Sequence, residues 1–105
     1  MALAGASLGL ALPALAAWGA TIEAQVQAAL ELHRITRVLL LDHRDCGAYR
    51  VYLDLNAAAD PARETAVHTT QLRAARAALT HRWPALVVEL LLMDMDGTVS
   101  AVTSV

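Results

Sequence analysis

Two periods of apolar residues alternate along the chain and predict helices and strands in turn. From residue 21 to residue 34, apolar side chains recur every three or four positions, which is typical of an amphipathic helix, and Thr21 is suited to cap its first turn. Residues 35–41 follow directly as a short apolar run. Such a run after a helix is typical of a strand covered on both faces, as in a parallel sheet. A polar turn over residues 42–47 then ends this strand.

A second long helix is predicted from Asp60 to residue 82. Aspartate is a strong N-cap, Pro61 suits the first helical position, and Pro84 ends the helix. Before this helix, residues 48–55 are expected to be helical and residues 56–60 to form a loop. The positions of the long helix that we expect to face the core are Val67, Ala74, Ala75, Ala78 and Leu79.

The end of the chain predicts two further strands joined by a hairpin. Residues 86–93 are almost entirely apolar, Asp96-Gly97 is a hairpin turn signal, and residues 99–102 follow as a third strand. The order is helix, strand, helix, helix, strand, strand. It predicts a single α/β domain over residues 1–105, with a mostly parallel central sheet flanked by helices and an antiparallel hairpin strand at its end.

The beginning of the chain has no charged side chain before Glu23. Its apolar run is long enough for a membrane span, and residues 1–16 could form a signal peptide with a small-x-small pattern at Ala14-Leu15-Ala16. However, no basic residue follows Met1, and glycine and proline interrupt the run. We therefore expect a buried strand and loop here, in a cytoplasmic protein without membrane contact. A small secreted domain is the alternative.

Composition excludes several classes of protein. Apolar residues make up 57% of the chain and charged residues 17%, which excludes intrinsic disorder. The formal net charge is −2 and only 4% of residues are aromatic, so no nucleic-acid partner is expected. A single cysteine, Cys46, excludes an internal disulfide and suits a reducing compartment.

A histidine and a cysteine three residues apart carry the most informative chemistry. His43 and Cys46 lie in the polar turn after the first predicted strand, where open α/β sheets place their sites. Imidazole nitrogen and thiolate sulfur are ligands that zinc binds well, and this spacing lets both converge on one ion. Because two ligands do not by themselves make a zinc site, the alternative is a buried free cysteine beside a solvent-facing histidine.

The sequence around this pair resembles the second metal-binding motif of the β-class carbonic anhydrases. Residues 40–48 read Leu-Leu-Asp-His-Arg-Asp-Cys-Gly-Ala, like that family's strand running into His-x-x-Cys-Gly-Ala. The helix ahead of the strand and the closing hairpin are also similar. The resemblance covers residues 21–102, and residues 3–6 are similar to the end of the family's second strand.

The resemblance implies a zinc enzyme. In that family, two cysteines and one histidine hold one zinc ion, and zinc lowers the pKa of bound water to about 7 so that hydroxide can hydrate CO2. By position, His43 would be the imidazole ligand and Cys46 one thiolate. The implied substrate is CO2 or bicarbonate, or a related small linear molecule, and the implied assembly is a homodimer or higher homo-oligomer.

The chain departs from the family pattern in its metal ligands. It has no second cysteine, and the family's upstream Cys-x-Asp-x-Arg motif is missing, together with the Asp-Arg pair that orients the zinc-bound water. Asp42 stands where the family usually has glycine. Asp42 and Asp45 are candidate catalytic groups, with turn formation as the alternative role.

A third ligand has several candidate sources. It could come from Asp45, His33, His68 or a partner subunit, although we expect His33 to be a helix-end residue and His68 to be partly exposed. We therefore expect weak zinc binding and little or no CO2 hydration. The alternative is a non-catalytic, oligomerising relative of the same fold.

Overall fold

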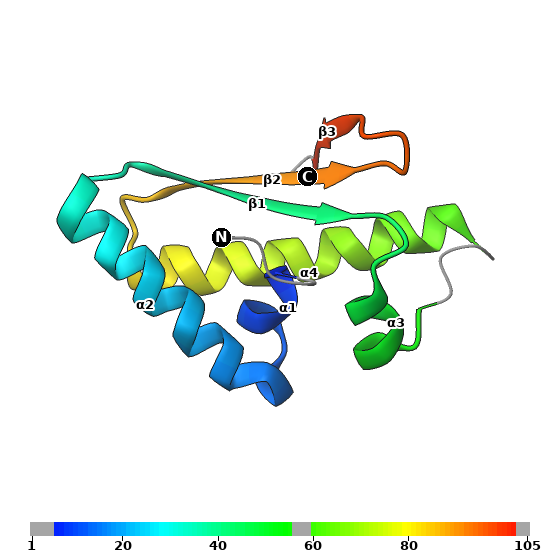
Figure 1. Cartoon of the computed structure of the whole chain (residues 1–105), viewed down its shortest axis with the longest axis horizontal. Coiled ribbons are helices and arrows are strands. Elements are labelled where there is room, and N and C mark those ends of the chain that lie inside the picture. The colour runs from blue at the N-terminus through cyan, green and yellow to red at the C-terminus, as the bar shows by residue number, and fades with distance from the viewer. Residues whose placement is uncertain (1–5, 56–59, 103–105) are drawn as a thin grey trace.

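The computed structural model describes residues 6–55 and 60–102, which form one small mixed sheet with helices gathered on one side of it (Figure 1). In the described chain, the strand order is β1-β2-β3. Strand β1 (Arg37–His43) pairs in parallel with β2 (Val87–Met93), and β3 (Val99–Ala101) pairs antiparallel with β2. The α/β class, the parallel pair and the antiparallel hairpin strand are therefore as the sequence predicts.

The helices of the second half begin and end close to their predicted bounds. Helix α3 spans Gly47–Leu53 and helix α4 spans Pro61–Arg82. The Asp60 carboxylate accepts a hydrogen bond from the backbone N–H of Arg63 at 3.1 Å, as expected of an N-cap. Residues 56–59 of the predicted loop lie outside the described residues.

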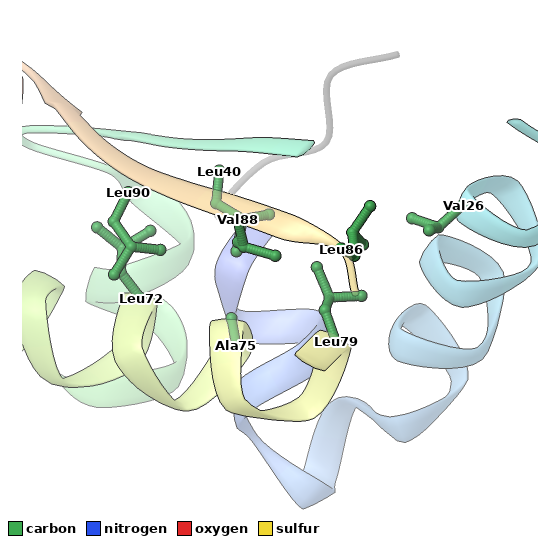
Figure 2. Packing of buried hydrophobic residues seen from close by; sticks show 8 residues of the cluster. All are labelled: Val26, Leu40, Leu72, Ala75, Leu79, Leu86, Val88 and Leu90. Carbon is green, nitrogen blue, oxygen red and sulfur yellow. The ribbon is translucent and has the colours of Figure 1, made fainter. Parts of the chain in front are cut away.

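The main core lies between the sheet and α4. Leu72, Ala75 and Leu79 of α4 point toward the strands, as Figure 2 shows. The other buried members of this cluster are Val26, Leu40, Leu86, Val88 and Leu90. The prediction that Ala74 faces the core is wrong, because Ala74 is exposed, whereas Glu64 and His68 are the buried polar residues of this helix.

The first segment is helical, so the expected strand and loop are wrong for its described part. Helix α1 (Ala6–Ala11) leads through a 3-10 turn, η1 (Pro13–Leu15), into helix α2 (Ala16–His33). Alanine is the strongest helix former, which favours this outcome over a strand. Leu8 and Leu15 are buried in a second apolar cluster. Residues 3–5 of the suggested family strand lie outside the described residues.

Helix α2 begins five positions before the predicted start at residue 21 and ends at His33. Its cap residue, Arg34, adopts the left-handed backbone conformation at φ 51°. No helix within residues 6–55 and 60–102 combines the length and apolar character needed to cross a bilayer.

Within the part of the chain that the structure describes, only one face of strand β1 is covered. This corrects the expected burial of both faces. Leu40 and Asp42 point toward the helices and are buried, whereas Leu39 and Leu41 are 55% and 43% exposed. The strand also begins two residues later than expected and runs on to His43. A continuous apolar run is compatible with one-sided burial as well, so the pattern alone could not decide.

Candidate functional site

The candidate site lies where the chain leaves β1 at the carboxyl end of the parallel strands. The backbone N–H of Arg44 donates to the carbonyl of Met93 at 2.9 Å, which extends the contact between β1 and β2 by one residue. Asp45 then turns the chain with φ 54°, and Cys46 is the N-cap of α3. Open α/β sheets place their ligand sites at this position.

His43 is the exposed member of the predicted metal pair. Its Nδ1 lies 2.9 Å from the carbonyl oxygen of Arg44. Because a carbonyl can only accept a hydrogen bond, Nδ1 carries the proton in this contact, and Nε2 of the neutral imidazole keeps its lone pair. Histidines that bind metals show this arrangement, in which the second ring nitrogen donates to a carbonyl or carboxylate. The Nε2 lone pair of His43 is therefore the one available to a metal ion.

Cys46 is the buried member of the pair. It is 5% exposed and belongs to the same apolar cluster as Leu8, Leu15 and Tyr49. Its side chain makes no capping hydrogen bond to α3, and it is a free cysteine. A thiol at the start of a helix beside a turn can serve as a ligand once deprotonated.

The candidate third ligands do not gather around this pair. His33 is exposed at the end of α2, where the chain approaches the opposite end of β1. The Asp45 carboxylate accepts a hydrogen bond from Arg50 at 2.9 Å. His68 is fully buried, so the prediction that it is partly exposed is wrong. Within the two described stretches, no group of three His, Cys, Asp or Glu residues is placed to hold a metal ion.

A buried polar network is centred on Asp42, the residue that precedes His43 in β1. The Oδ2 atom of Asp42 accepts hydrogen bonds from Ser7 Oγ at 2.8 Å, from His68 Nδ1 at 2.9 Å and from the Tyr49 hydroxyl. All four residues are at most 3% exposed. They come from α1, β1, α3 and α4, so one carboxylate connects four elements of the fold.

The chemistry of this network is structural rather than open to a substrate. Since the Asp42 carboxylate is an acceptor, His68 donates through Nδ1. Its ring also stacks on Tyr49, with centroids 4.0 Å apart at 39°. The second nitrogen, Nε2, lies 3.8 Å from Glu64 Oε2, which is beyond hydrogen-bond distance. Asp42 therefore positions the strand end and the helices around it.

Arg44 connects the turn after β1 to α4 and to the β2–β3 connection. Its guanidinium donates to Asp94 Oδ1 at 2.5 Å, to Glu64 Oε1 at 3.2 Å and to Thr65 Oγ1 at 2.7 Å. The hydrogen bond to Asp94 raises the pKa of Arg44, and that to Glu64 raises it further. Glu64 Oε2 also accepts from the backbone N–H of Asp45 at 2.7 Å. These contacts hold in place the turn at Arg44 and Asp45, which directly follows His43 at the end of β1.

The sequence predicted His43 and Cys46 but missed Ser7 and Tyr49. A signal for the network was present, because Asp42 continues the apolar strand at an inward position, and a buried carboxylate needs donors. Which donors supply it could not be inferred, since Ser7 and His68 are 35 and 26 residues away in the chain.

We expect the free energy of unfolding to fall above pH 10 because of Tyr49. Burial raises the pKa of Tyr49 above its ordinary value of 10.0, and the charge of Asp42 raises it further. The unfolded chain releases this proton above pH 10 while the folded chain retains it, so the stabilisation is complete below pH 10 and is lost as pH rises. Ionisation of this one tyrosine in the unfolded chain lowers the free energy of unfolding by about 1.4 kcal/mol at pH 11.

Urea unfolding between pH 8 and pH 11 measures this loss. The chain has no lysine, so few other groups titrate in this range. Tyr49→Phe should flatten the pH dependence, whereas Tyr52→Phe, at a tyrosine that is 45% exposed, should preserve it. An equal slope in both variants would contradict the assignment to Tyr49.

Two relatives are similar to almost the whole chain. An uncharacterized protein of Rickettsia conorii is 37% identical over 102 residues, a match that covers 97% of this chain and 55% of that protein. An uncharacterized protein of Rickettsia bellii is 35% identical over 102 residues, covering 97% of this chain and 62% of that protein. No family model and no solved structure matches the chain. The chain thus spans about half to three fifths of the length of the curated relatives it matches.

Proposed function

We propose that this chain is a zinc-binding, carbonic anhydrase-like domain that supplies His43 and Cys46 to the metal. The observation that carries the proposal is the contact of His43 Nδ1 with the Arg44 carbonyl. This contact leaves the lone pair of Nε2 free to bind a metal ion at the carboxyl end of β1. The cysteine three residues later offers a thiolate at the start of α3. Nitrogen and sulfur donors together favour zinc over magnesium or calcium.

The donor set fits zinc only in part. His43 is oriented for a metal, Cys46 must lose its proton and reach the ion, and no third donor joins them among residues 6–55 and 60–102. The remaining donors would come from a partner subunit or from polypeptide outside these residues. Two protein ligands predict weak binding by the chain alone, because zinc sites use three or four.

The proposed reaction is the reversible hydration of CO2 or the conversion of a related small linear molecule. Zinc supplies a Lewis acid that ionises water near neutral pH, which is the chemistry that this hydration requires. The chain's own contribution is to orient His43 and to hold the turn through the contacts of Arg44 with Glu64 and Asp94. Since the family's Asp-Arg pair is missing, we expect little or no hydration by this chain alone.

The proposal predicts that His43→Ala weakens zinc binding by about 10–100-fold or more, because it removes an oriented ligand. Zinc affinity is measured by competition with a chromophoric chelator on the purified full chain. His81→Ala is the matched control, since His81 is an exposed histidine in the last turn of α4 and should leave the affinity unchanged.

Cobalt substitution tests the thiolate separately. Co²⁺ bound to a thiolate gives a near-ultraviolet charge-transfer band, which Cys46→Ala should remove and His81→Ala should preserve. If His43→Ala binds zinc as tightly as the unmodified chain, or if the band survives Cys46→Ala, the pair is not the metal site.

A further inference from the structure

A groove lies at the amino end of the parallel strands, at the opposite end of β1 and β2 from His43 (Figure 1). It runs between the connection from α2 to β1 and the connection from α4 to β2, and its volume is about 350 Å³. This volume falls within the range of small-molecule sites in proteins, about 300–1,000 Å³. Five apolar side chains and one charged side chain decide its chemistry: Leu30, Ile35, Trp83, Pro84 and Leu86, with Arg82.

The apolar walls of the groove are held in place by hydrogen bonds of both connections. The backbone N–H of Val87 donates to the carbonyl of Thr36 at 3.0 Å. The backbone N–H of Leu86 donates to the carbonyl of Trp83, also at 3.0 Å. The Trp83 indole N–H donates to Oε1 of Gln27 in α2 at 3.2 Å, which fixes the orientation of the ring. The groove is therefore formed before a ligand arrives, and this lowers the ordering cost of binding.

Arg82 adds one positive charge to these apolar walls. Its guanidinium carbon lies 4.5 Å from the centroid of the Trp83 ring, and its Nη1 donates to Glu23 Oε2 at 2.9 Å. A guanidinium carries five N–H donors, and the bond to Glu23 uses one of them. The side chain of Arg82 is also 46% exposed. Arg82 can therefore keep its ion pair with Glu23 and bind a second carboxylate.

We propose that this groove binds a small aromatic carboxylate, with the ring of the ligand between the apolar walls and its carboxylate on Arg82. Arginine and a carboxylate form charge-assisted hydrogen bonds, which are stronger than those between neutral groups. The fixed ring of Trp83 favours an aromatic ligand, because aromatic rings attract one another in edge-to-face and offset arrangements. The groove lies away from His43 and Cys46, so the proposal does not rest on the proposed zinc site.

The single cation of the groove disfavours other classes of small ligand. A phosphate group carries close to two negative charges, and here Glu23 already lies beside the guanidinium. A sugar would bury many hydroxyl groups against walls that are mostly apolar, which is unfavourable unless each hydroxyl finds a partner. A ligand with one carboxylate and an apolar remainder matches both the charge and the walls.

Two-dimensional proton–nitrogen NMR of the full chain, titrated with phenylpropionate, tests the proposal. A chelator is present, so that the result is independent of zinc. The chain has two tryptophans, Trp18 and Trp83, and Trp18→Phe assigns their two indole N–H signals. We expect a saturable shift of the Trp83 signal with a dissociation constant on the order of 0.1–1 mM, and no shift of the Trp18 signal.

Three variants test the role of Arg82. Arg82→Gln should weaken the binding of phenylpropionate at least about tenfold, because it removes a charged donor, and should leave the binding of neutral phenylpropanol unchanged. Arg63→Gln is the matched control, at an exposed arginine near the start of α4. Glu23→Gln should strengthen binding by up to about fivefold, because it removes the carboxylate that competes for Arg82.

The same spectra show whether each variant is folded. The proposal is overturned if the Trp83 signal does not shift at up to about 10 mM phenylpropionate, roughly ten times the weakest expected dissociation constant. It is also overturned if folded Arg82→Gln binds phenylpropionate as tightly as the unmodified chain. Equal losses in Arg82→Gln and Arg63→Gln would show a response to the net charge of the chain rather than to the groove, and weaker binding by Glu23→Gln would contradict a carboxylate on Arg82.

Discussion

Asp42→Ala is expected to lower the free energy of unfolding by about 3–5 kcal/mol, because it removes the shared acceptor of a buried network. Ser7, Tyr49 and His68 all donate to Asp42 Oδ2, and none of them has access to water. Ser7 Oγ and the Tyr49 hydroxyl lie 2.9 Å apart and can still bond to each other. The Nδ1 proton of His68 loses its acceptor, and a buried unpaired donor is costly.

Urea denaturation of the variant measures the loss, and Asp45→Asn is the matched control. Asp45 is an aspartate of the same turn whose ion pair with Arg50 is exposed, so its loss should change the free energy of unfolding by less than about 1 kcal/mol. Asparagine also tolerates the φ of 54° at this position. Asp42→Asn keeps one oxygen and should give an intermediate loss of free energy of unfolding. It takes the place of Asp42→Ala in this test if that variant does not fold. A loss below about 1 kcal/mol for Asp42→Ala would show that the network does not stabilise the fold.

Local signals were enough to predict most of the second half of the fold. Asp60 and Pro61 define a helix start by capping and by a fixed φ, and the structure has both features. The hairpin depends on Gly97, which adopts φ 89°, and Asp96 accepts a hydrogen bond from the backbone N–H of Thr98 at 2.9 Å. Each of these features is decided by residues within four positions of one another, so a single sequence contains the information.

Features that depend on distant contacts could not be predicted in the same way. The burial of His68 depends on Asp42, which lies on a different element 26 residues earlier. The helical first segment depends on the packing of Leu8 and Leu15 against Tyr49, and an alanine-rich apolar run does not distinguish this from a strand. Likewise, the run at residues 35–41 showed that β1 is apolar but not that only one face is covered.

The candidate site likewise has a part that local sequence predicts and a part that depends on distant contacts. His43 and Cys46 were predicted as a metal-binding pair from chemistry and spacing, since only three positions separate the end of β1 from the N-cap of α3. The Asp42 network combines α1, β1, α3 and α4, and no local pattern links Ser7 to the turn. Any role of Asp42 in orienting that turn therefore became visible only in three dimensions.

The close approach of α1 and α2 explains why a glycine stands in the interior of a long helix. A Cβ atom added at Gly19 would lie 2.4 Å from the carbonyl oxygen of Gly9, a distance that real Cβ atoms do not reach. The obstructing atom belongs to the backbone, so it cannot turn aside as a side chain could. Helix α1 is also held in place by buried Leu8 and by the hydrogen bond from Ser7 to Asp42. The two helices must therefore separate to admit a methyl group.

Gly19→Ala is accordingly expected to lower the free energy of unfolding by about 2–3 kcal/mol, even though alanine favours a helix by about 1 kcal/mol. Gly47→Ala is the matched control: it lies at the start of α3, with nothing within 4 Å of the added Cβ, and should stabilise by about 0.4–1 kcal/mol. Thermal and urea unfolding of both variants measure the two effects. The same substitution is thus expected to lower the free energy of unfolding at Gly19 and to raise it at Gly47, because only at Gly19 must the added methyl group separate packed backbones. If Gly19→Ala were also neutral or stabilising, α1 would not be held against α2 as closely as this packing requires.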